Sequence, residues 1–303
     1  MGTPEFALPS LSLLLDNAYD IPAVVTVPDK PQGRGQKTGS SPVKKAALEH
    51  GIPILQPADL NDPVFTNALL VLNADLFVVV AFRILPAKVF RIPHKGAFNL
   101  HASLLPKYRG AAPINWAIMN GEQETGVTTF MLKERVDTGS IILRARTKIG
   151  PDETAGELHD KLAAIGAEIV LQSVRLIEQG KAVLSEQDES KASKAPKIFT
   201  NDCRIDWREP AQRIHDRVRG LSPSPTAWTK HAGKVLKLFR TKRLEEKSGH
   251  RPGEVVRSDK KELHVMTGDG LLSILELQLE GRNRMMAEEF LRGYALPSGD
   301  LLE

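Results

Sequence analysis

Two polar side chains with complementary chemistry lie two positions apart in the segment 96–101, Gly-Ala-Phe-Asn-Leu-His. The segment is short, mixed apolar and bounded by small and polar residues, which is typical of a strand. Side chains on a strand alternate between faces, so Asn99 and His101 are expected to project to the same side. An amide can donate a hydrogen bond to a developing oxyanion, and an imidazole can move a proton near neutral pH. The pair therefore has the chemistry of a catalytic site.

A carboxylate that could hold the imidazole follows the next expected strand. Asp137 begins the sequence Asp137-Thr138-Gly139, and an acidic group beside a histidine orients the ring and stabilises its charged form. From spacing alone two structural interpretations stay open. An Asn-x-His pair can be a satisfied structural pair, and Asp-Thr-Gly is also typical of a turn.

The residues after the strand carry a resemblance to a known family. His101-Ala102-Ser103-Leu104-Leu105-Pro106 leads into Arg109-Gly110-Ala111-Ala112-Pro113-Ile114, and this stretch closely resembles the folate-dependent formyltransferases. Further matches follow in the same order along nearly the whole chain: Gly2-Thr3-Pro4-Glu5-Phe6, Pro28-Asp29-Lys30-Pro31, Ser41-Pro42-Val43-Lys44, Asp137-Thr138-Gly139, Ile205-Asp206-Trp207 and Gly268-Asp269-Gly270.

The resemblance implies a function and a set of site residues. Asn99, His101 and Asp137 correspond to the catalytic residues of the family. The run Arg-Gly-Ala-Ala-Pro-Ile is similar to the branch that transfers the formyl group of 10-formyltetrahydrofolate to the amino group of methionyl initiator tRNA, for translation initiation. The residues expected to bind the folate are Ser103, Leu104, Leu105, Pro106, Val80, Phe82 and Leu85. The residues expected to bind the tRNA are Lys30, Arg34, Lys37 and Lys44.

Two alternatives carry the same motifs. The chain could be a formyltransferase for a small amine, such as a glycinamide ribonucleotide or an amino sugar, which would need neither the basic loop 29–40 nor a second domain. It could also be a non-catalytic RNA-binding protein on the same fold. The presence of Asn99, His101 and Asp137 together argues against the non-catalytic reading.

The elements around the site predict an α/β fold. Apolar strand segments at 21–27, 52–55 and 76–82 alternate with helical patterns at 43–49 and 62–73. This alternation favours a doubly wound, mostly parallel sheet of Rossmann-like type, followed by a helix at 155–178. Ligands of such sheets bind outside the carboxyl ends of the strands, where Asn99 and His101 are expected. We predict a catalytic domain at residues 1–187.

The C-terminal third has a different pattern. Residues 188–204 lack periodicity and are interpreted as a linker, and residues 205–303 hold a short helix and several strand candidates separated by turn residues. This pattern, with the resemblance, predicts a small OB-like β-barrel that binds tRNA. A basic face at 230–243 supports the tRNA reading, although a solvated charged edge has the same composition.

The amino end departs from the family pattern. The family normally has a strand before the helix that starts near residue 4, and almost nothing precedes Gly2 here. We expect this chain to begin at an internal methionine and to lack its first strand. The mass of the protein made from its own gene would test this expectation.

Composition narrows the class of protein. Hydrophobic residues make up 41% of the 303 residues, so a core can form. Cys203 is the single cysteine, which favours a reducing compartment, and we expect a cytoplasmic monomer with no membrane association. The formal charge of +4 is compatible with a polyanionic partner without requiring one. No histidine is paired with cysteine or carboxylate at ligand spacing, so no metal is expected.

Overall fold

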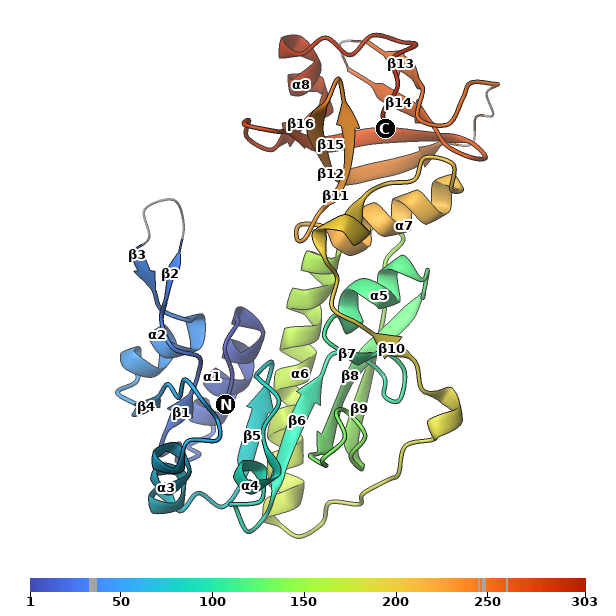
Figure 1. Ribbon diagram of the computed structural model, residues 1–303. Coiled ribbons are helices and arrows are strands. Elements are labelled where there is room, and N and C mark those ends of the chain that lie inside the picture. Colours follow the sequence, from blue (N-terminus) through green and yellow to red (C-terminus); the bar gives the residue numbers. More distant parts are fainter. Residues whose placement is uncertain (33–36, 245, 247–248, 260) are drawn as a thin grey trace. The chain divides into compact units, whose positions relative to one another are not determined.

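The computed structural model describes residues 1–303 apart from 33–36, 245, 247–248 and 260 (Figure 1). The chain divides into two compact units, which are described separately. The first comprises residues 1–110, 126–147 and 159–194, and the second comprises 111–125, 148–158 and 195–303. The domain boundaries expected from the sequence, at 187 and 205, stay a prediction.

The first unit is built on a row of mostly parallel strands. A two-stranded parallel sheet joins β1 (Val24–Val25) to β4 (Ile54–Leu55). A four-stranded sheet has the order β5-β6-β8-β9. Its strands are β5 (Phe77–Val80), β6 (Ala97–His101), β8 (Glu124–Met131) and β9 (Ile141–Lys148). β5 and β6 run parallel, and β8 runs antiparallel to β6.

Among the described residues, the main chain of Met1 and Gly2 links these two sheets by hydrogen bonds. Gly2 donates its N–H to the carbonyl of Val25 in β1, at 3.0 Å, and forms a parallel bridge with Val80 in β5. The row therefore reads β4, β1, Met1–Gly2, β5, β6, β8 and β9. The doubly wound, mostly parallel sheet predicted from the sequence is confirmed.

Some helices of the first unit begin at a side-chain cap. The helices are η1 (Glu5–Ala7), α1 (Leu8–Asp16), α2 (Pro42–Glu49), α3 (Pro63–Leu72), α4 (Ala87–Phe90) and α6 (Ala155–Glu178). The Ser41 side chain accepts from the N–H of Lys44 at 3.1 Å, and a proline occupies the first helical turn of α2. α6 covers β6 and β8: the hydroxyls of Ser173 and Thr129 lie 2.7 Å apart, and a Cβ on Gly166 would be 2.6 Å from Leu100.

The segment expected as a loop at 28–41 contains paired strands. β2 (Lys30–Gln32) and β3 (Lys37–Gly39) run antiparallel, with Lys30 opposite Gly39. The irregular loop predicted here is therefore wrong for these residues.

The second unit contains an antiparallel sheet and three helices among its described residues. The strands are β11 (Ala227–His231), β12 (Lys234–Leu244), β13 (Val255–Ser258), β14 (Leu263–Met266), β15 (Leu271–Leu279) and β16 (Met285–Met286). The helices are α5 (Pro113–Met119), α7 (Ala211–Leu221) and α8 (Ala287–Gly293). The Asn115 side chain ties α5 to α7 by donating to the Gly220 carbonyl at 2.7 Å.

The strand order of this sheet is open. It runs β11-β12-β15-β14-β13, with β16 on β15. The antiparallel β-domain is confirmed, but the described strands show no closed barrel, because β11 and β13 stand at opposite ends of the path. The core lies between the sheet and α7, where Ile214, Leu236 and Leu263 are fully buried.

The segment predicted as a linker holds short ordered elements, η2 (Glu189–Lys191), β10 (Lys194–Ala195) and η3 (Thr200–Cys203). β10 pairs with β7 (Arg109–Gly110). Of the helices in the described part of the chain, none combines the length and apolar character needed to cross a membrane.

Candidate active site

β6 places Asn99 and His101 as the sequence predicts. Within the strand, Asn99 is opposite Val79 of β5 and Phe130 of β8, and His101 is opposite Thr128. The side-chain oxygen of Asn99 is buried and has no hydrogen-bond partner among the described residues. A buried acceptor without a partner costs free energy, so this position is suited to a bound group that donates to it.

The ring of His101 is held by a main-chain carbonyl. Its Nε2 lies 2.8 Å from the carbonyl oxygen of Tyr108. A carbonyl only accepts, so Nε2 carries the hydrogen and Nδ1 is the nitrogen left for chemistry. Tyr108 has a φ of 60°, in the left-handed region. That conformation is uncommon for a bulky residue, and here it turns the carbonyl towards His101.

Asp137 stands on the Nδ1 side of the ring. Its Oδ2 lies 3.9 Å from His101 Nδ1, and both side chains are more than nine-tenths buried. This distance is longer than a hydrogen bond, but in a buried site it allows the carboxylate to stabilise positive charge on the ring. The same Oδ2 accepts the N–H of Gly110 at 2.9 Å. The structure thus brings together the three residues expected to be catalytic.

The turn that carries Asp137 is strained and tightly enclosed. Asp137 has a φ of 55°. A Cβ added to Gly139 would lie 1.6 Å from the Met131 carbonyl oxygen. Only glycine fits at 139, so the Asp-Thr-Gly sequence is a structural requirement of the turn as well as a source of the carboxylate.

Gln187 is the residue that sequence reasoning missed. It was expected at the end of the catalytic domain, beside a linker. Instead its buried amide nitrogen donates to both carbonyls of the turn, Asp137 at 2.9 Å and Gly139 at 2.8 Å. Its oxygen accepts from Arg109 Nη2 at 2.7 Å, and Arg109 is also paired with Glu189 at 2.7 Å. No local pattern in the sequence reveals this partner, because fifty positions separate Gln187 from Asp137.

The turn expected to hold the folate is fixed by its neighbours. Ser103 is fully buried and donates its hydroxyl to the Lys107 carbonyl at 2.6 Å. Thr128 donates to the Ser103 carbonyl at 2.7 Å and accepts the N–H of Leu105 at 3.2 Å. Leu105 packs in the core, Pro106 is buried, and Leu104 is half-buried. The turn is rigid, with its polar groups largely paired.

The second segment expected to line the folate site lies after β5. Val80 is buried in the sheet and Leu85 in the core below it. Phe82 is half-buried beneath the Arg83 guanidinium, which lies 5.3 Å from the ring centroid. Arg83 also donates to the Pro57 carbonyl at 2.6 Å, and these contacts hold the Ala81-Phe82-Arg83 loop in place.

The basic residues expected to contact tRNA differ in their surroundings. Lys30 is exposed on β2, and Arg34 lies outside the described residues. Lys37 is placed in β3 through its main chain. Lys44 is engaged within the fold: its Nζ lies 2.6 Å from Asp29 and 2.8 Å from the Gln56 side-chain oxygen. The hydrogen bond from Lys44 lowers the pKa of the Asp29 carboxyl.

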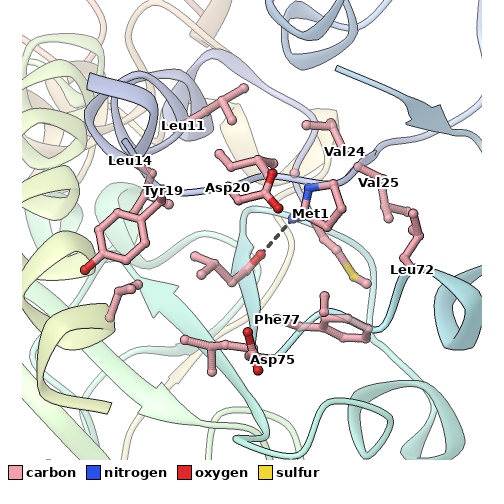
Figure 2. Close-up of a pocket in the computed structure, with 18 of the residues that line it drawn as sticks. Met1, Leu11, Leu14, Tyr19, Asp20, Val24, Val25, Leu72, Asp75 and Phe77 are labelled. Atoms are coloured by element: carbon pink, nitrogen blue, oxygen red, sulfur yellow. Dashed lines mark hydrogen bonds between the residues drawn. The ribbon is translucent and has the colours of Figure 1, made fainter. Parts of the chain in front are cut away.

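A cavity of about 400 Å³ lies in the same unit but away from these residues. It is lined by β1, β5 and α1, with the Met1 amine at its edge (Figure 2). Asn99, His101 and Asp137 are not among its lining residues. In the described part of the chain no group of three or more histidine, cysteine, aspartate or glutamate side chains could hold a metal ion.

Comparison with known proteins places this geometry in a family. Residues 2–174 match the formyl transferase family, and residues 197–295 match the formyl transferase C-terminal domain. The chain belongs to the formyltransferase family.

Several relatives of 44 to 48% identity are named methionyl-tRNA formyltransferase. One from Porphyromonas gingivalis is 48% identical over all of this chain and 97% of its own length. One from Bacteroides fragilis is 46% identical over 98% of this chain and 94% of its own. One from Caldanaerobacter subterraneus is 46% identical over all of this chain and 98% of its own length.

Solved structures share the fold at lower identity. A sugar 3N-formyl transferase, WlaRD, crystallised with dTDP and 5-N-formyl-THF, has a TM-score of 0.68 at 21% identity, over 93% of this chain and 97% of its own. An N-formyltransferase from Helicobacter canadensis, in complex with folinic acid and dTDP-3-aminofucose, has a TM-score of 0.67 at 20% identity. The match covers 90% of this chain and 96% of that protein.

Proposed function

We propose that this protein transfers the formyl group of 10-formyltetrahydrofolate to the amino group of methionyl initiator tRNA, in the cytoplasm, for translation initiation. The observation that carries the proposal is the placement of Asn99 on β6 two positions before His101, whose buried ring faces the buried Asp137 carboxylate. The names of relatives nearly half identical over the whole chain point to the same amine substrate.

The chemistry needs a neutral amine, an oxyanion stabiliser and a proton carrier. The amine nitrogen of the methionyl group attacks the formyl carbon, which forms a C–N bond and places negative charge on the formyl oxygen. The Asn99 amide and the protonated His101 ring stabilise that charge. The tetrahedral intermediate collapses by breaking the bond from the formyl carbon to the folate nitrogen, and the proton lost by the amine moves to that nitrogen.

His101 is arranged for this work. The Tyr108 carbonyl holds the Nε2–H at 2.8 Å, which leaves Nδ1 for the proton relay. Asp137, 3.9 Å from Nδ1, favours the charged ring while the oxyanion exists. No nucleophilic side chain is required, and the only thiol, Cys203, is buried in the second unit.

We assign the folate to the rigid turn and the loop after β5. Ser103, Leu104, Leu105 and Pro106 present a fixed main chain beside His101, and Val80, Phe82 and Leu85 form an apolar base at the end of β5. Flat heterocycles bind in sites that combine apolar walls with a few fixed polar groups. The unpartnered Asn99 oxygen supplies one such group.

We assign tRNA contacts to the β2–β3 region and the second unit. Lys30 is exposed, and with Arg34 and Lys37 it provides cations for phosphates. Lys44 is a positioning residue in this proposal, because its charge is already matched by Asp29. Arg34→Ala should weaken use of charged tRNA and leave folate binding unchanged.

One assay tests the function. Labelled 10-formyltetrahydrofolate is incubated with the protein and either charged initiator tRNA, a glycinamide ribonucleotide or an amino sugar. Label should enter only the tRNA, and His101→Ala should abolish it. Formylation of a small amine in preference to tRNA would contradict the proposal, and tRNA binding without transfer to any amine would favour the non-catalytic alternative.

A further inference from the structure

The paired strands β2 and β3 form a sheet of their own in the first unit, separate from the β1–β4 sheet and from the four-stranded sheet (Figure 1). We call these two strands the arm. An isolated two-stranded hairpin is only marginally stable in water, and no described strand of the central row pairs with this one. The residues at which the chain enters and leaves the arm are therefore the places where its direction can be set.

The carboxylate of Asp29 joins the two ends of the arm. Asp29 directly precedes β2, and Ser40 directly follows β3. Lys44 Nζ lies 2.6 Å from Asp29 Oδ2, and the Ser40 hydroxyl makes a longer contact with the same oxygen at 3.4 Å. Asp29 Oδ1 accepts from the Gln56 amide at 2.9 Å. One side chain thus receives donors from the exit of the arm, from α2 and from the residue after β4.

Two of these donors are themselves held by the fold. Lys44 lies in the first turn of α2, where its N–H is bound by Ser41 Oγ at 3.1 Å, and that hydroxyl lies 2.8 Å from the buried Thr26 Oγ1. Gln56 donates to the Val27 carbonyl at 2.8 Å and accepts from Lys44 Nζ at 2.8 Å. The carboxylate at the entry of the arm is therefore fixed to α2 and to the segments that follow β1 and β4.

The pairing of Asp29 with Lys44 also separates the basic residues near the arm by role. The two side chains are 24% and 20% exposed, and the hydrogen bonds from Lys44 and Gln56 lower the pKa of the Asp29 carboxyl. The carboxylate is therefore charged at neutral pH and matches the charge of Lys44. In contrast, the next residue along the chain, Lys30, is exposed on the arm. The anchor thus uses its cation internally, and the arm presents one to solvent.

We propose that Asp29 is a positioning residue that sets the direction of the arm, and that it thereby favours a polyanionic formyl acceptor over a small amine. The inference rests on the proposed function, in which cations of the arm contact the phosphates of tRNA. Asp29 acts through the arm and touches no reacting atom. An arm that is already directed loses less conformational freedom when the tRNA binds, so the complex forms at a lower tRNA concentration.

Three variants separate positioning of the arm from general stability. Asp29→Ala removes all the contacts of the carboxylate, whereas Asp29→Asn keeps an acceptor oxygen and loses the charge that pairs with Lys44. Asp16→Ala is the matched control, because Asp16 is an exposed aspartate of the same unit whose carboxylate accepts from Ser12 of its own helix. The Tm of each variant checks that it is folded.

Spin labels on Lys30→Cys and Glu49→Cys, in the Cys203→Ser background, measure the direction of the arm. Lys30 lies on the arm and Glu49 ends α2, and both side chains are exposed. The parent should give one narrow distribution of label distances. Asp29→Ala should broaden it, Asp29→Asn should broaden it less, and Asp16→Ala should leave it unchanged. An equally narrow distribution in Asp29→Ala would overturn the proposal.

Formyl transfer by the unlabelled proteins gives the second readout. If the arm of Asp29→Ala holds the competent direction about one-tenth of the time, the KM for charged initiator tRNA should rise about 10-fold, while kcat and folate affinity should hardly change. A broadened arm with an unchanged KM, or an equal rise in Asp16→Ala, would contradict the inference. A parent protein that prefers a small amine to tRNA would refute the proposed function and the acceptor preference assigned to the arm, while the label distances decide separately whether Asp29 positions it.

Discussion

Two places in the same row of strands are built in opposite ways. At the end of β6, the Asp137 turn is held by Gly110, Gln187 and close packing around Gly139, with hydrogen bonds of 2.8 to 2.9 Å. Between β5 and β1, only Met1 and Gly2 fill the row, beside a hollow of about 400 Å³. Strain is tolerated at the first place because its surroundings determine the conformation. The second place has no such support, so it should limit stability without limiting chemistry.

The largest expected effect is on the pH dependence of stability, through Met1. Its amine has an ordinary pKa of 8.0 and a pKa of about 5 in the folded chain. Between these values the unfolded chain binds more protons than the folded chain, so the free energy of unfolding falls as the pH is lowered from 8 to 5. The difference corresponds to ~4 kcal/mol at most.

Urea unfolding at several pH values measures this dependence. Acetylation of the Met1 amine removes the titrating group and should flatten the curve in this window. If the free energy of unfolding depended on pH with the same slope before and after acetylation, other groups would be responsible. The region around Met1 would then not be the pH-sensitive part of the sheet.

The next largest effect is on turnover, at the candidate active site where β6 ends. Asn99→Ala and His101→Ala each remove a group that we propose to stabilise the oxyanion, and should each lower kcat by ~100- to 1000-fold. The Tm should change little relative to the parent, because both side chains end a strand whose ladder stays intact. Near-normal turnover by either folded variant would remove that residue from the mechanism.

Asp137→Asn separates charge from shape. The amide oxygen can still accept the N–H of Gly110, so the turn should persist, while the ring of His101 loses its negative neighbour. We expect kcat to fall by ~100-fold and folate affinity, measured by calorimetry, to stay within a few-fold. Weak folate binding in this variant would indicate that Asp137 shapes the pocket instead of serving the histidine.

The smallest effect in this series concerns Gln187. Gln187→Leu keeps the volume but leaves two carbonyls of the turn without their donor. We expect kcat to fall ~10-fold with KM little changed, and the free energy of unfolding to fall by ~1 to 3 kcal/mol. Gln187→Glu is the conservative comparison, because it keeps the acceptor for Arg109 but removes the donor.

Glu189→Gln is the matched control for Gln187. Glu189 contacts the same Arg109, yet it is exposed and does not touch the turn, so turnover should hardly change. Equal losses in the Glu189 and Gln187 variants would mean that the Arg109 pairing matters and that the carbonyl contacts do not.

The sequence predicts the parts of this molecule that depend on local pattern. The strand at 96–101 and the helix at 155–178 follow from the local residue pattern, and the structure confirms them. In contrast, β11 was not predicted, because Ala227–His231 mixes apolar and basic residues and depends on β12 for its pairing. α8 was also missed, since its buried Phe290 finds its core only in the folded sheet.

For the candidate site too, some features could be predicted from the sequence and others could not. Asn99, His101 and Asp137 could be named from residue type and resemblance, but what holds them could not. The Tyr108 carbonyl, the Gly110 N–H and Gln187 act over distances in sequence that no local rule covers. The open order of the second unit's sheet could not be predicted for a related reason, because only the pairing of the strands shows that β11 and β13 stand at opposite ends of it.

The main-chain contacts at Tyr108 and Gly110 have a consequence for protein engineering. Two of the three proposed catalytic side chains are positioned by backbone atoms: the carbonyl of Tyr108 contacts His101, and the N–H of Gly110 contacts Asp137. Alanine scanning cannot delete a backbone atom, so a scan of 107–110 would underestimate this segment. Replacing the amide before Gly110 with an ester, by semisynthesis, would remove the donor alone. Libraries aimed at new amine substrates should therefore leave the path of this segment unchanged and vary the side chains around it.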